Sequence, residues 1–274
     1  MNHRIVAAGL MTLLTLLTLA GCQTVQTTGG GAVGVERQQR MMISSAQINA
    51  AAEQSYAQTM QAAQGKGVLN RDANQVNRVR AITSRLIPVT SAFRQDAPGW
   101  RWEVNVITSQ EVNAWCMPGG KIAVYTGLMD NLRLTDDELA AVIGHEIAHA
   151  LREHGREKAS QQAAQNAVIG VGAAVLGVGE GMAGLANIAA QVTYGLPNSR
   201  EFEREADRIG VELAARAGYD PRAAITLWQK MAQASDGRSP PGFLNTHPTA
   251  SDRISDLQKY AAQVMPIYQS TQRR

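Results

Sequence analysis

The spacing of hydrophobic residues predicts a chain that is mostly helical. In several segments apolar side chains recur every three or four positions, which is typical of helices that bury one face. Another segment is rich in Ala and Gln, which also favours a helix. Helices are expected over residues 44–64, 72–87, 135–151, 199–217 and 252–260, with a further one beginning at Asp220-Pro221.

Strand-like alternation is confined to residues 100–126. Apolar residues occupy every second position over 102–106, and two further strands are expected over 114–117 and 121–126. Pro118-Gly119-Gly120 between the last two is a natural turn, so a hairpin or a closely related bend is expected. Because helices dominate on both sides of this region, the expected fold class is α+β with a small antiparallel or mixed sheet.

The helix expected over residues 135–151 has a clear start. Thr135 as the N-cap and Glu138 three residues later form a capping box. Glu146 falls inside the apolar stripe of this helix. A carboxylate on a buried helix face is costly unless it is paired or lies near a metal ion. A role in a buried site is therefore favoured over a surface salt bridge.

The first 21 residues have the pattern of an export signal. Arg4 precedes an apolar run from Ile5 to Leu19 that is too short for a stable membrane span. Leu19-Ala20-Gly21-Cys22 resembles the bacterial lipobox, in which the cysteine becomes the lipid-modified first residue. The alternative is an ordinary signal peptide with an incidental cysteine. Gln23 in place of Asp at the next position implies the outer membrane, facing the periplasm.

These features set the expected domain organisation. A signal peptide over 1–21 is followed by the lipidated Cys22 and a flexible Gln-, Thr- and Gly-rich tether, together residues 22–43. One domain over 44–262 and a polar tail over 263–274 complete the chain. The Gly- and Ala-rich segment 163–190 is too interrupted to span a membrane. It predicts either close-packed core helices or a mobile segment over the active cleft or against the membrane surface.

Composition and charge narrow the functional classes. With 274 residues, 45% of them hydrophobic, the chain can bury a substantial core. The net charge of +3 comes from scattered basic residues, so nucleic acid is not an expected partner. Cys116 is the only cysteine after Cys22, so no disulfide forms within the expected mature chain. It is expected to be a small buried side chain rather than a nucleophile.

His145-Glu146-Ile147-Ala148-His149 supplies two metal-ligand side chains one helical turn apart. Residues four apart share a helix face, so both imidazoles can hold one ion while Glu146 reaches a bound water. A catalytic zinc usually takes three protein ligands, so a third must come from elsewhere. His154 is expected on the opposite side of the same helix, as a surface histidine near its C-terminus.

Glu203 is the better candidate for the third ligand. At about 100° per residue, Glu203 and Asp207 share a face beside the apolar stripe of the 199–217 helix. Glu203 can therefore ligate the metal while Asp207 steadies a ligating histidine. Glu201 and Glu205 lie about 200° from Glu203 on the helix. With the neighbouring arginines, they are expected to form a solvated run of charges.

The order of these features resembles a known family. The zinc metallopeptidases that include HtpX and the CAAX prenyl endopeptidases share a similar series of motifs, and the similarity covers roughly residues 44–260. The lipobox makes the chain similar to the periplasmic lipoprotein branch, with LoiP, YcaL and the BepA peptidase domain. The motifs are Asn113-Ala114 with Pro118-Gly119-Gly120, the HEIAH helix, the cluster from Glu203 to Asp207, and Thr246-His247-Pro248.

The resemblance implies a predominantly helical zincin-type (gluzincin) domain with a small sheet beside the HExxH helix. It implies one zinc ion per chain on His145, His149 and Glu203, with Glu146 as general base and Asp207 beside the third ligand. His247 would be either a regulatory fourth ligand or an aid to the oxyanion. The substrate is expected to lie extended along an exposed strand edge. The residues expected there are Asn113, Ala114, Pro118, Gly119 and Gly120.

The resemblance also implies a quality-control endopeptidase at the outer membrane of a Gram-negative bacterium. Its substrates would be unfolded or misassembled envelope proteins, and outer-membrane assembly machinery would be a partner. Two other classes stay open. One is a latent or non-catalytic chaperone-like assembly factor in which zinc holds the fold and His247 closes the open position. The other is a structural lipoprotein without metal.

Overall fold

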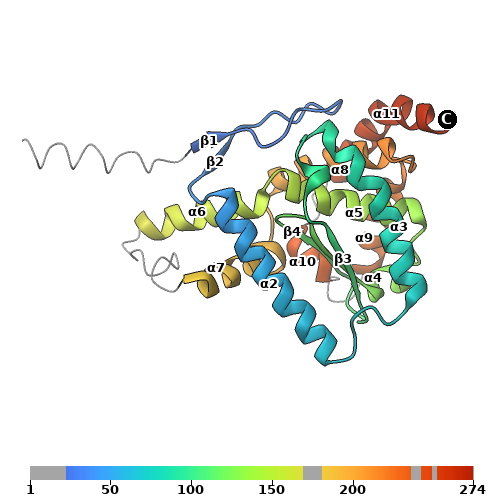
Figure 1. The fold of residues 1–274 in the computed structure, drawn as a ribbon. Helices are drawn as coiled ribbons and strands as arrows, with labels where there is room; N and C mark the ends of the chain where they lie inside the picture. Colours follow the sequence, from blue (N-terminus) through green and yellow to red (C-terminus); the bar gives the residue numbers. More distant parts are fainter. Residues whose placement is uncertain (1–22, 169–180, 236–241, 249–251, 274) are drawn as a thin grey trace, which may run out of the picture.

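The computed structural model describes residues 23–168, 181–235, 242–248 and 252–273, with helices arranged around a small sheet (Figure 1). The predicted signal peptide and the predicted lipidation site Cys22 lie outside the described residues. The strands are β1 (Gln23–Val25), β2 (Gln39–Met41), β3 (Glu103–Ile107), β4 (Ala114–Met117) and β5 (Lys121–Tyr125). The helices are α2 (Ser45–Gly65), α3 (Ala73–Val89), α4 (Thr126–Asn131), α5 (Asp136–Leu151), α6 (His154–Val168), α7 (Gly181–Ala190), α8 (Arg200–Arg216), α9 (Ala223–Ser235), α10 (Gly242–Thr246) and α11 (Arg253–Thr271). A π-helical turn (Gln191–Gly195) follows α7, and short 3₁₀ turns occupy Thr90–Ala92 and Ala97–Gly99.

Three strands form a mixed sheet at the centre. Its order is β3-β5-β4, with β3 parallel and β4 antiparallel to β5. The predicted hairpin of β4 and β5 turns at Gly119 and Gly120, which have φ angles of +80° and +84°. A Cβ on Gly120 would also lie 2.6 Å from the Trp102 ring, so this position requires glycine. The architecture confirms the predicted helix-rich α+β class with a small sheet.

The sheet separates two hydrophobic clusters, because alternate residues of a strand point to opposite faces. Ala114 and Cys116 of β4 join the larger cluster, with residues of α3, α5, α8 and α9. Trp115 and Met117 join the smaller cluster, with residues of α2 and α7. Tyr56 of α2 packs edge-on against Trp115, with 5.8 Å between the ring centroids. As a result β4 is buried on both faces.

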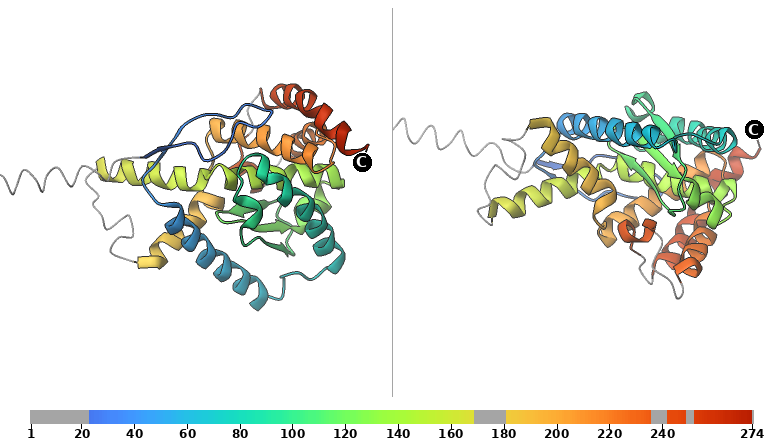
Figure 2. Two further views of the ribbon diagram at one scale, coloured as in Figure 1. Left: turned by 45° about the horizontal axis from the view of Figure 1, so that its top comes forward. Right: turned by 90° about the horizontal axis from the view of Figure 1, so that it is seen from below.

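Helix α5 lies between the sheet and α8 (Figure 2). Its predicted capping box is present. The Thr135 hydroxyl accepts from the backbone N–H of Glu138 at 3.3 Å, and the Glu138 carboxylate accepts from the backbone N–H of Thr135 at 2.8 Å. Every residue of α5 from Glu138 to Leu151 is buried. Helix α5 is therefore the central helix of the domain, and α3, α8, α9 and β4 pack around it.

Helices α5 and α8 cross at two glycines. A Cβ on Gly210 would lie 2.8 Å from the backbone nitrogen of His145, and one on Gly144 would lie 3.0 Å from the carbonyl oxygen of Gly210. A Cβ on Gly210 would force a shift of the backbone and one on Gly144 would be tightly crowded, so the two backbones touch directly. The crossing sets the spacing of the two helices next to His145.

The prediction of a flexible tether is wrong for residues 23–43, called here the N-terminal segment. It crosses the domain beside α6 and reaches α11, where Gln263 donates a hydrogen bond to the Ala32 carbonyl (Figure 1). Val33, Val35 and Met41 of this segment are buried, whereas Met42 is 43% exposed. Gln39 is fully buried and donates to the Arg152 carbonyl and to Glu157. The composition, rich in Gln, Thr and Gly, predicted flexibility because it carries no sign of these contacts with residues distant in the sequence.

Two further predictions are modified by the structure. The final helix α11 extends to Thr271, so much of the predicted polar tail over 263–274 is helical. The Gly- and Ala-rich segment 163–190 contains the end of α6 and all of α7, while its residues 169–180 lie outside the described residues. Ala186 and Ala189 of α7 are buried, and α7 packs against α2. For α7, this agrees with the expectation of close-packed core helices. Across the described ranges, none of the helices combines the length and apolar character needed to cross a membrane.

We expect Gly210→Ala to lower the free energy of unfolding by about 1–3 kcal/mol, because its methyl group overpacks the helix crossing. Gly65→Ala is the matched control, since a Cβ at the end of α2 would meet no atom within 4 Å. It should leave stability unchanged or slightly higher. Urea denaturation followed by circular dichroism measures both variants, and equal unfolding midpoints would contradict the argument.

Candidate metal centre

Three segments bring polar side chains to one buried point. Helix α5 contributes His145, Glu146 and His149, helix α8 contributes Glu203, and His247 follows α10. All five residues are at most 8% exposed. Such a concentration of ionisable groups in a protein interior needs charge compensation at short range.

Four of these residues have donor atoms arranged as around a single cation. His145 Nε2 lies 3.1 Å from both His149 Nε2 and His247 Nδ1. Glu203 Oε1 lies 3.3 Å from His149 Nε2 and 3.0 Å from His247 Nδ1. Donors at the corners of a tetrahedron with zinc–ligand distances near 2.0–2.1 Å are about 3.3 Å apart. The cluster therefore has the dimensions of a closed tetrahedral zinc site.

The donor chemistry also favours a positive charge between the rings. His145 Nδ1 faces Asp207 Oδ1 at 3.0 Å, and His149 Nδ1 faces His154 Nδ1 at 2.8 Å. A neutral imidazole carries a single N–H, and metal ligation through Nε2 requires that this proton sits on Nδ1, facing these outer contacts. The Nε2 lone pairs of the two rings then face each other at 3.1 Å. A cation between them turns this repulsion into attraction, so these residues fit a zinc ion.

A proton can take the place of that cation in the metal-free protein. Burial acts to lower the pKa of His145, but the carboxylates of Asp207 and Glu203 raise it to about 9. Burial lowers the pKa of His149 well below its usual value, so this ring stays neutral. Metal binding must therefore displace a proton from His145, which makes the metal affinity dependent on pH.

Arg253 compensates the two carboxylates beside the rings. Its Nη1 lies 2.9 Å from Glu203 Oε2, and its Nη2 donates to Asp207 Oδ1 at 2.7 Å. The guanidinium also stacks on Trp228, 3.3 Å from the ring centroid. Burial acts to raise the pKa of Glu203, yet the charges of His247 and Arg253 hold it well below its usual value. Glu203 is therefore a charged ligand.

Glu146 lies beside the four donor atoms. Its Oε1 is 3.3 Å from His247 Nε2, and burial raises the pKa of its carboxyl group above the usual value. A raised pKa makes the carboxylate a stronger base near neutral pH. The cavity lined by Glu146, His149 and Cys116 has a volume of about 20 Å³, which holds about one water molecule. A polypeptide has no room at the site in this arrangement.

The predicted substrate strand borders this cavity but is covered. Cys116 and Pro118 line the cavity, and β4 is an edge strand of the three-stranded sheet. All four residues of β4 are buried. The π-helical turn lies beside the strand, with the Tyr194 ring 5.4 Å from that of Trp115. The exposed strand edge expected from the sequence is therefore closed in this structure.

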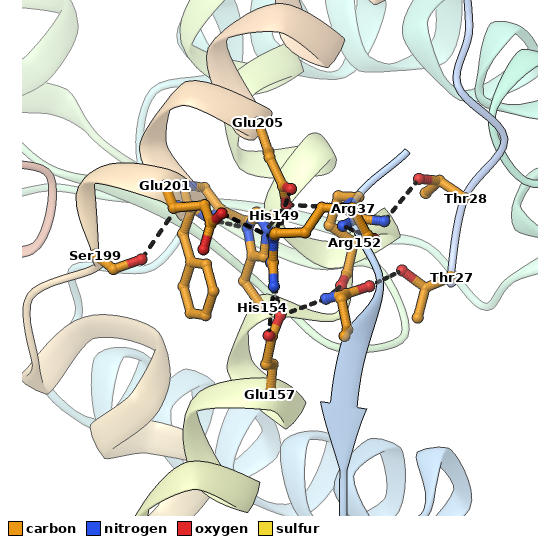
Figure 3. Close-up of polar contacts among 12 residues, drawn as sticks. Thr27, Thr28, Arg37, His149, Arg152, His154, Glu157, Ser199, Glu201 and Glu205 are labelled. Carbon is orange, nitrogen blue, oxygen red and sulfur yellow. Dashed lines mark hydrogen bonds and ion pairs between the residues drawn. The ribbon is translucent and has the colours of Figure 1, made fainter. Parts of the chain in front are cut away.

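The prediction that His154 is a surface histidine is wrong. Helix α5 ends at Leu151, and Glu153 turns the chain with a φ of +50°. This turn brings His154, the first residue of α6, into contact with His149 and Glu205 (Figure 3). Glu205 is likewise buried rather than solvated. A glycine at position 153 would have signalled a left-handed turn, but the residue there is Glu153. The prediction therefore continued the α5 helix past its actual end and placed His154 on the wrong side.

Asn198 and Arg253 are site residues that sequence reasoning missed. The Asn198 side-chain amide donates to Glu203 Oε1 at 2.9 Å. Arg253 begins α11, far from the HExxH helix in the sequence, and no charge pattern links the two segments. The residues expected as ligands do meet, because His145, His149, Glu203 and His247 each offer an atom within 4.8 Å of the others.

Comparisons with known proteins identify a family and relatives. The model of peptidase family M48 matches residues 73–261. Mitochondrial metalloendopeptidase OMA1 of Arabidopsis thaliana is 38% identical over 176 residues, 64% of this chain and 35% of that protein. The bovine (Bos taurus) mitochondrial metalloendopeptidase OMA1 is 34% identical over 217 residues, 72% of this chain and 39% of that protein. The beta-barrel assembly-enhancing protease of Escherichia coli K12 is 33% identical over 172 residues, 59% of this chain and 35% of that protein. The chain spans only 35–51% of the length of such curated relatives.

We expect Arg253→Met to lower the free energy of unfolding by about 3–5 kcal/mol, because it leaves the buried Glu203 and Asp207 carboxylates without their shared cation. Urea denaturation in the presence of a chelator isolates this effect from metal binding. Arg204→Ala is the control, since it removes an ion pair with Asp252 whose partners are both 45% exposed. A small loss for both variants alike would show that Arg253 does not balance the buried charges.

Proposed function

Because the chain belongs to peptidase family M48, we propose that it is a zinc-dependent endopeptidase that hydrolyses peptide bonds of unfolded or misassembled envelope proteins. The observation that carries the proposal is the buried cluster of His145, His149 and Glu203 with Glu146 beside it. Three ligands and a carboxylate base are the set that metal-assisted peptide hydrolysis requires.

The residues of the chain divide the chemistry between them. A zinc ion on the three expected ligands would supply a Lewis acid and a water molecule of lowered pKa. Glu146 takes the proton of the attacking water and passes it to the leaving nitrogen. Asp207, 3.0 Å from His145 Nδ1, holds that ring in the ligating orientation. Arg253 forms buried ion pairs with the carboxylates of Glu203 and Asp207 and so fixes their positions.

His247 closes the site in the arrangement described above. Its Nδ1 takes the fourth corner of the donor tetrahedron, which in a catalytic zinc site belongs to water or substrate. Phe243 stacks on its ring at 4.2 Å between centroids and holds it there. We assign this arrangement to a latent resting state that opens when His247 leaves. The same closure favours the second candidate function, a latent or non-catalytic chaperone-like assembly factor.

An extended polypeptide would bind along β4 once the covering turn has moved. The strand has no second strand partner within the described ranges, so its free edge can pair with a substrate backbone. Backbone pairing tolerates many side-chain sequences, which suits a protease of unfolded proteins. The hairpin residues Asn113, Ala114, Pro118, Gly119 and Gly120 would form this binding edge.

We place the protein at the periplasmic face of the outer membrane, attached through lipid on Cys22. The sequence Leu19-Ala20-Gly21-Cys22 supports the lipid anchor. The similarity to a beta-barrel assembly-enhancing protease supports substrates and partners in outer-membrane assembly. The similarity to the OMA1 metalloendopeptidases supports the peptidase chemistry, although those relatives are mitochondrial.

Glu146→Gln should reduce cleavage of casein by about 10²–10⁴-fold, because the amide cannot accept the proton of water. The zinc content should stay at one ion per chain, since Glu146 is not among the expected ligands. Zinc is measured by mass spectrometry and cleavage by fluorescence release, with and without a chelator. Glu201→Gln is the control, because Glu201 lies on α8 with its side chain 61% exposed.

Stoichiometric zinc without chelator-sensitive cleavage under any activating condition, and none by His247→Ala either, would favour the chaperone-like function over the peptidase. Retained function of Glu146→Gln in cells would favour the same alternative. Absence of zinc from the wild-type protein, together with His145→Ala leaving fold and function intact, would support a purely structural lipoprotein.

His247→Ala should raise the rate of casein cleavage several-fold while leaving one zinc ion bound, because it opens the fourth corner of the site. The measurement compares initial rates at equal zinc occupancy. A rate below that of the wild-type protein at full occupancy would show instead that His247 assists the reaction, as an oxyanion donor would.

A further inference from the structure

The two ring nitrogens of His149 face different surroundings. Its Nε2 points to the centre of the donor cluster, 3.1 Å from His145 Nε2 and 3.3 Å from Glu203 Oε1. Its Nδ1 lies 2.8 Å from Nδ1 of His154. An imidazole that binds a metal through Nε2 carries its proton on Nδ1, and the partner of that proton fixes the tautomer and the ring plane.

The contacts of His154 allow only one direction of hydrogen bonding from His149 through His154 to Glu205 when His149 binds a metal through Nε2. With His149 as a ligand, its Nδ1–H must donate, so Nδ1 of His154 must accept. The proton of a neutral His154 then sits on Nε2, which lies 3.0 Å from Glu205 Oε2. A carboxylate accepts and does not donate, so the direction His149 to His154 to Glu205 is set from its far end.

The ring of His154 is held in place for this contact. It is 1% exposed and stacks on Phe202 with 4.4 Å between centroids and 6° between planes. The left-handed turn at Glu153 brings it back toward α5. Burial and stacking therefore fix the ring plane in which one nitrogen faces His149 and the other faces Glu205.

Glu205 is in turn fixed by two guanidinium groups (Figure 3). Its carboxylate accepts from Arg152 Nε at 3.0 Å and from Arg37 Nε at 2.8 Å. Burial acts to raise the pKa of Glu205, but the hydrogen bonds from His154 and Arg37 bring it well below the usual value. These contacts hold the Glu205 carboxylate where its Oε2 faces Nε2 of His154.

We propose that His154, oriented by Glu205, is a positioning residue that holds His149 in the Nδ1–H tautomer needed for metal binding. It does for His149 what Asp207 does for His145, through an intervening neutral ring instead of a direct carboxylate. The neutral ring supplies direction without placing another buried negative charge at the centre. The inference rests on the proposed zinc site and assigns roles to two residues outside the expected ligands and base.

The test is a zinc titration of the full chain against a chelator of known affinity. His154→Leu removes both polar contacts and should weaken zinc binding by about 10–100-fold, as for other residues that orient a metal ligand. His154→Gln has an amide oxygen to accept from His149 and an amide N–H to donate to Glu205, so it should bind zinc nearly as tightly as the wild-type protein. Glu205→Gln should give a smaller loss than His154→Leu.

Glu157→Gln is the matched control. Glu157 is buried and binds the same Arg37, at 2.7 and 2.9 Å, but it has no hydrogen bond with His154 among the described contacts. Its zinc affinity should match that of the wild-type protein. Circular dichroism of the metal-free variants checks that each is folded, and Glu205→Gln carries the test if His154→Leu does not fold.

A second readout reports the tautomer itself. In ¹⁵N-labelled, zinc-loaded protein, two-bond ¹H–¹⁵N correlation spectra distinguish Nδ1–H from Nε2–H histidines. His149 should appear as the Nδ1–H form in the wild-type protein and in His154→Gln, and should lose its slowly exchanging Nδ1–H signal in His154→Leu. Folded His154→Leu and Glu205→Gln with wild-type zinc affinity and an unchanged His149 signal would overturn the proposal. A wild-type protein that binds no zinc would instead overturn the proposed function.

Discussion

Direct backbone contact between α5 and α8 is the constraint on which the site depends. At the crossing, a Cβ on Gly210 would collide with the backbone of His145, and one on Gly144 would be crowded by the Gly210 carbonyl. Ligands from two helices can share one ion only if their axes are held at a spacing that the side chains reach. A short Asp or Glu contact such as that of Asp207 with His145 would be lost with even a small separation. The helix crossing that packs α5 against α8 therefore also positions the metal ligands.

The second requirement is charge balance in an interior that excludes water. Glu203 and Asp207 share Arg253 on one side of the histidines, while Glu205 has Arg152 and Arg37 on the other. Each carboxylate thus has a guanidinium partner before any metal binds. Because buried ion pairs give little net stability, their value here is in fixing the direction of each carboxylate. Directed carboxylates in turn fix the tautomers of the rings that hold the metal.

Local signals predicted most of the fold and the central residues of the site. The capping box of α5, the helical period of α8 and the glycine turn after β4 each depend on a few neighbouring residues. The same 100° periodicity placed Glu203 and Asp207 on one face, and both side chains now lie beside His145. The family match confirms the resemblance to HExxH metallopeptidases.

Prediction failed where contacts between residues distant in the sequence determine the conformation of the chain. Glu153 adopts a left-handed conformation without being glycine, and the N-terminal segment is ordered by partners on α6 and α8.

The ordered N-terminal segment changes how the proposed membrane anchor relates to the metal centre. Strand β1 begins at Gln23, directly after the proposed lipidation site, and pairs with β2, which lies beside α6. Arg37 of this segment connects to Glu205, His154 and His149 through polar contacts of 2.8–3.0 Å. A lipid on Cys22 would then hold the domain directly at the bilayer instead of at the end of a flexible chain. The orientation of the packed domain, rather than the length of a tether, would determine which substrates reach β4.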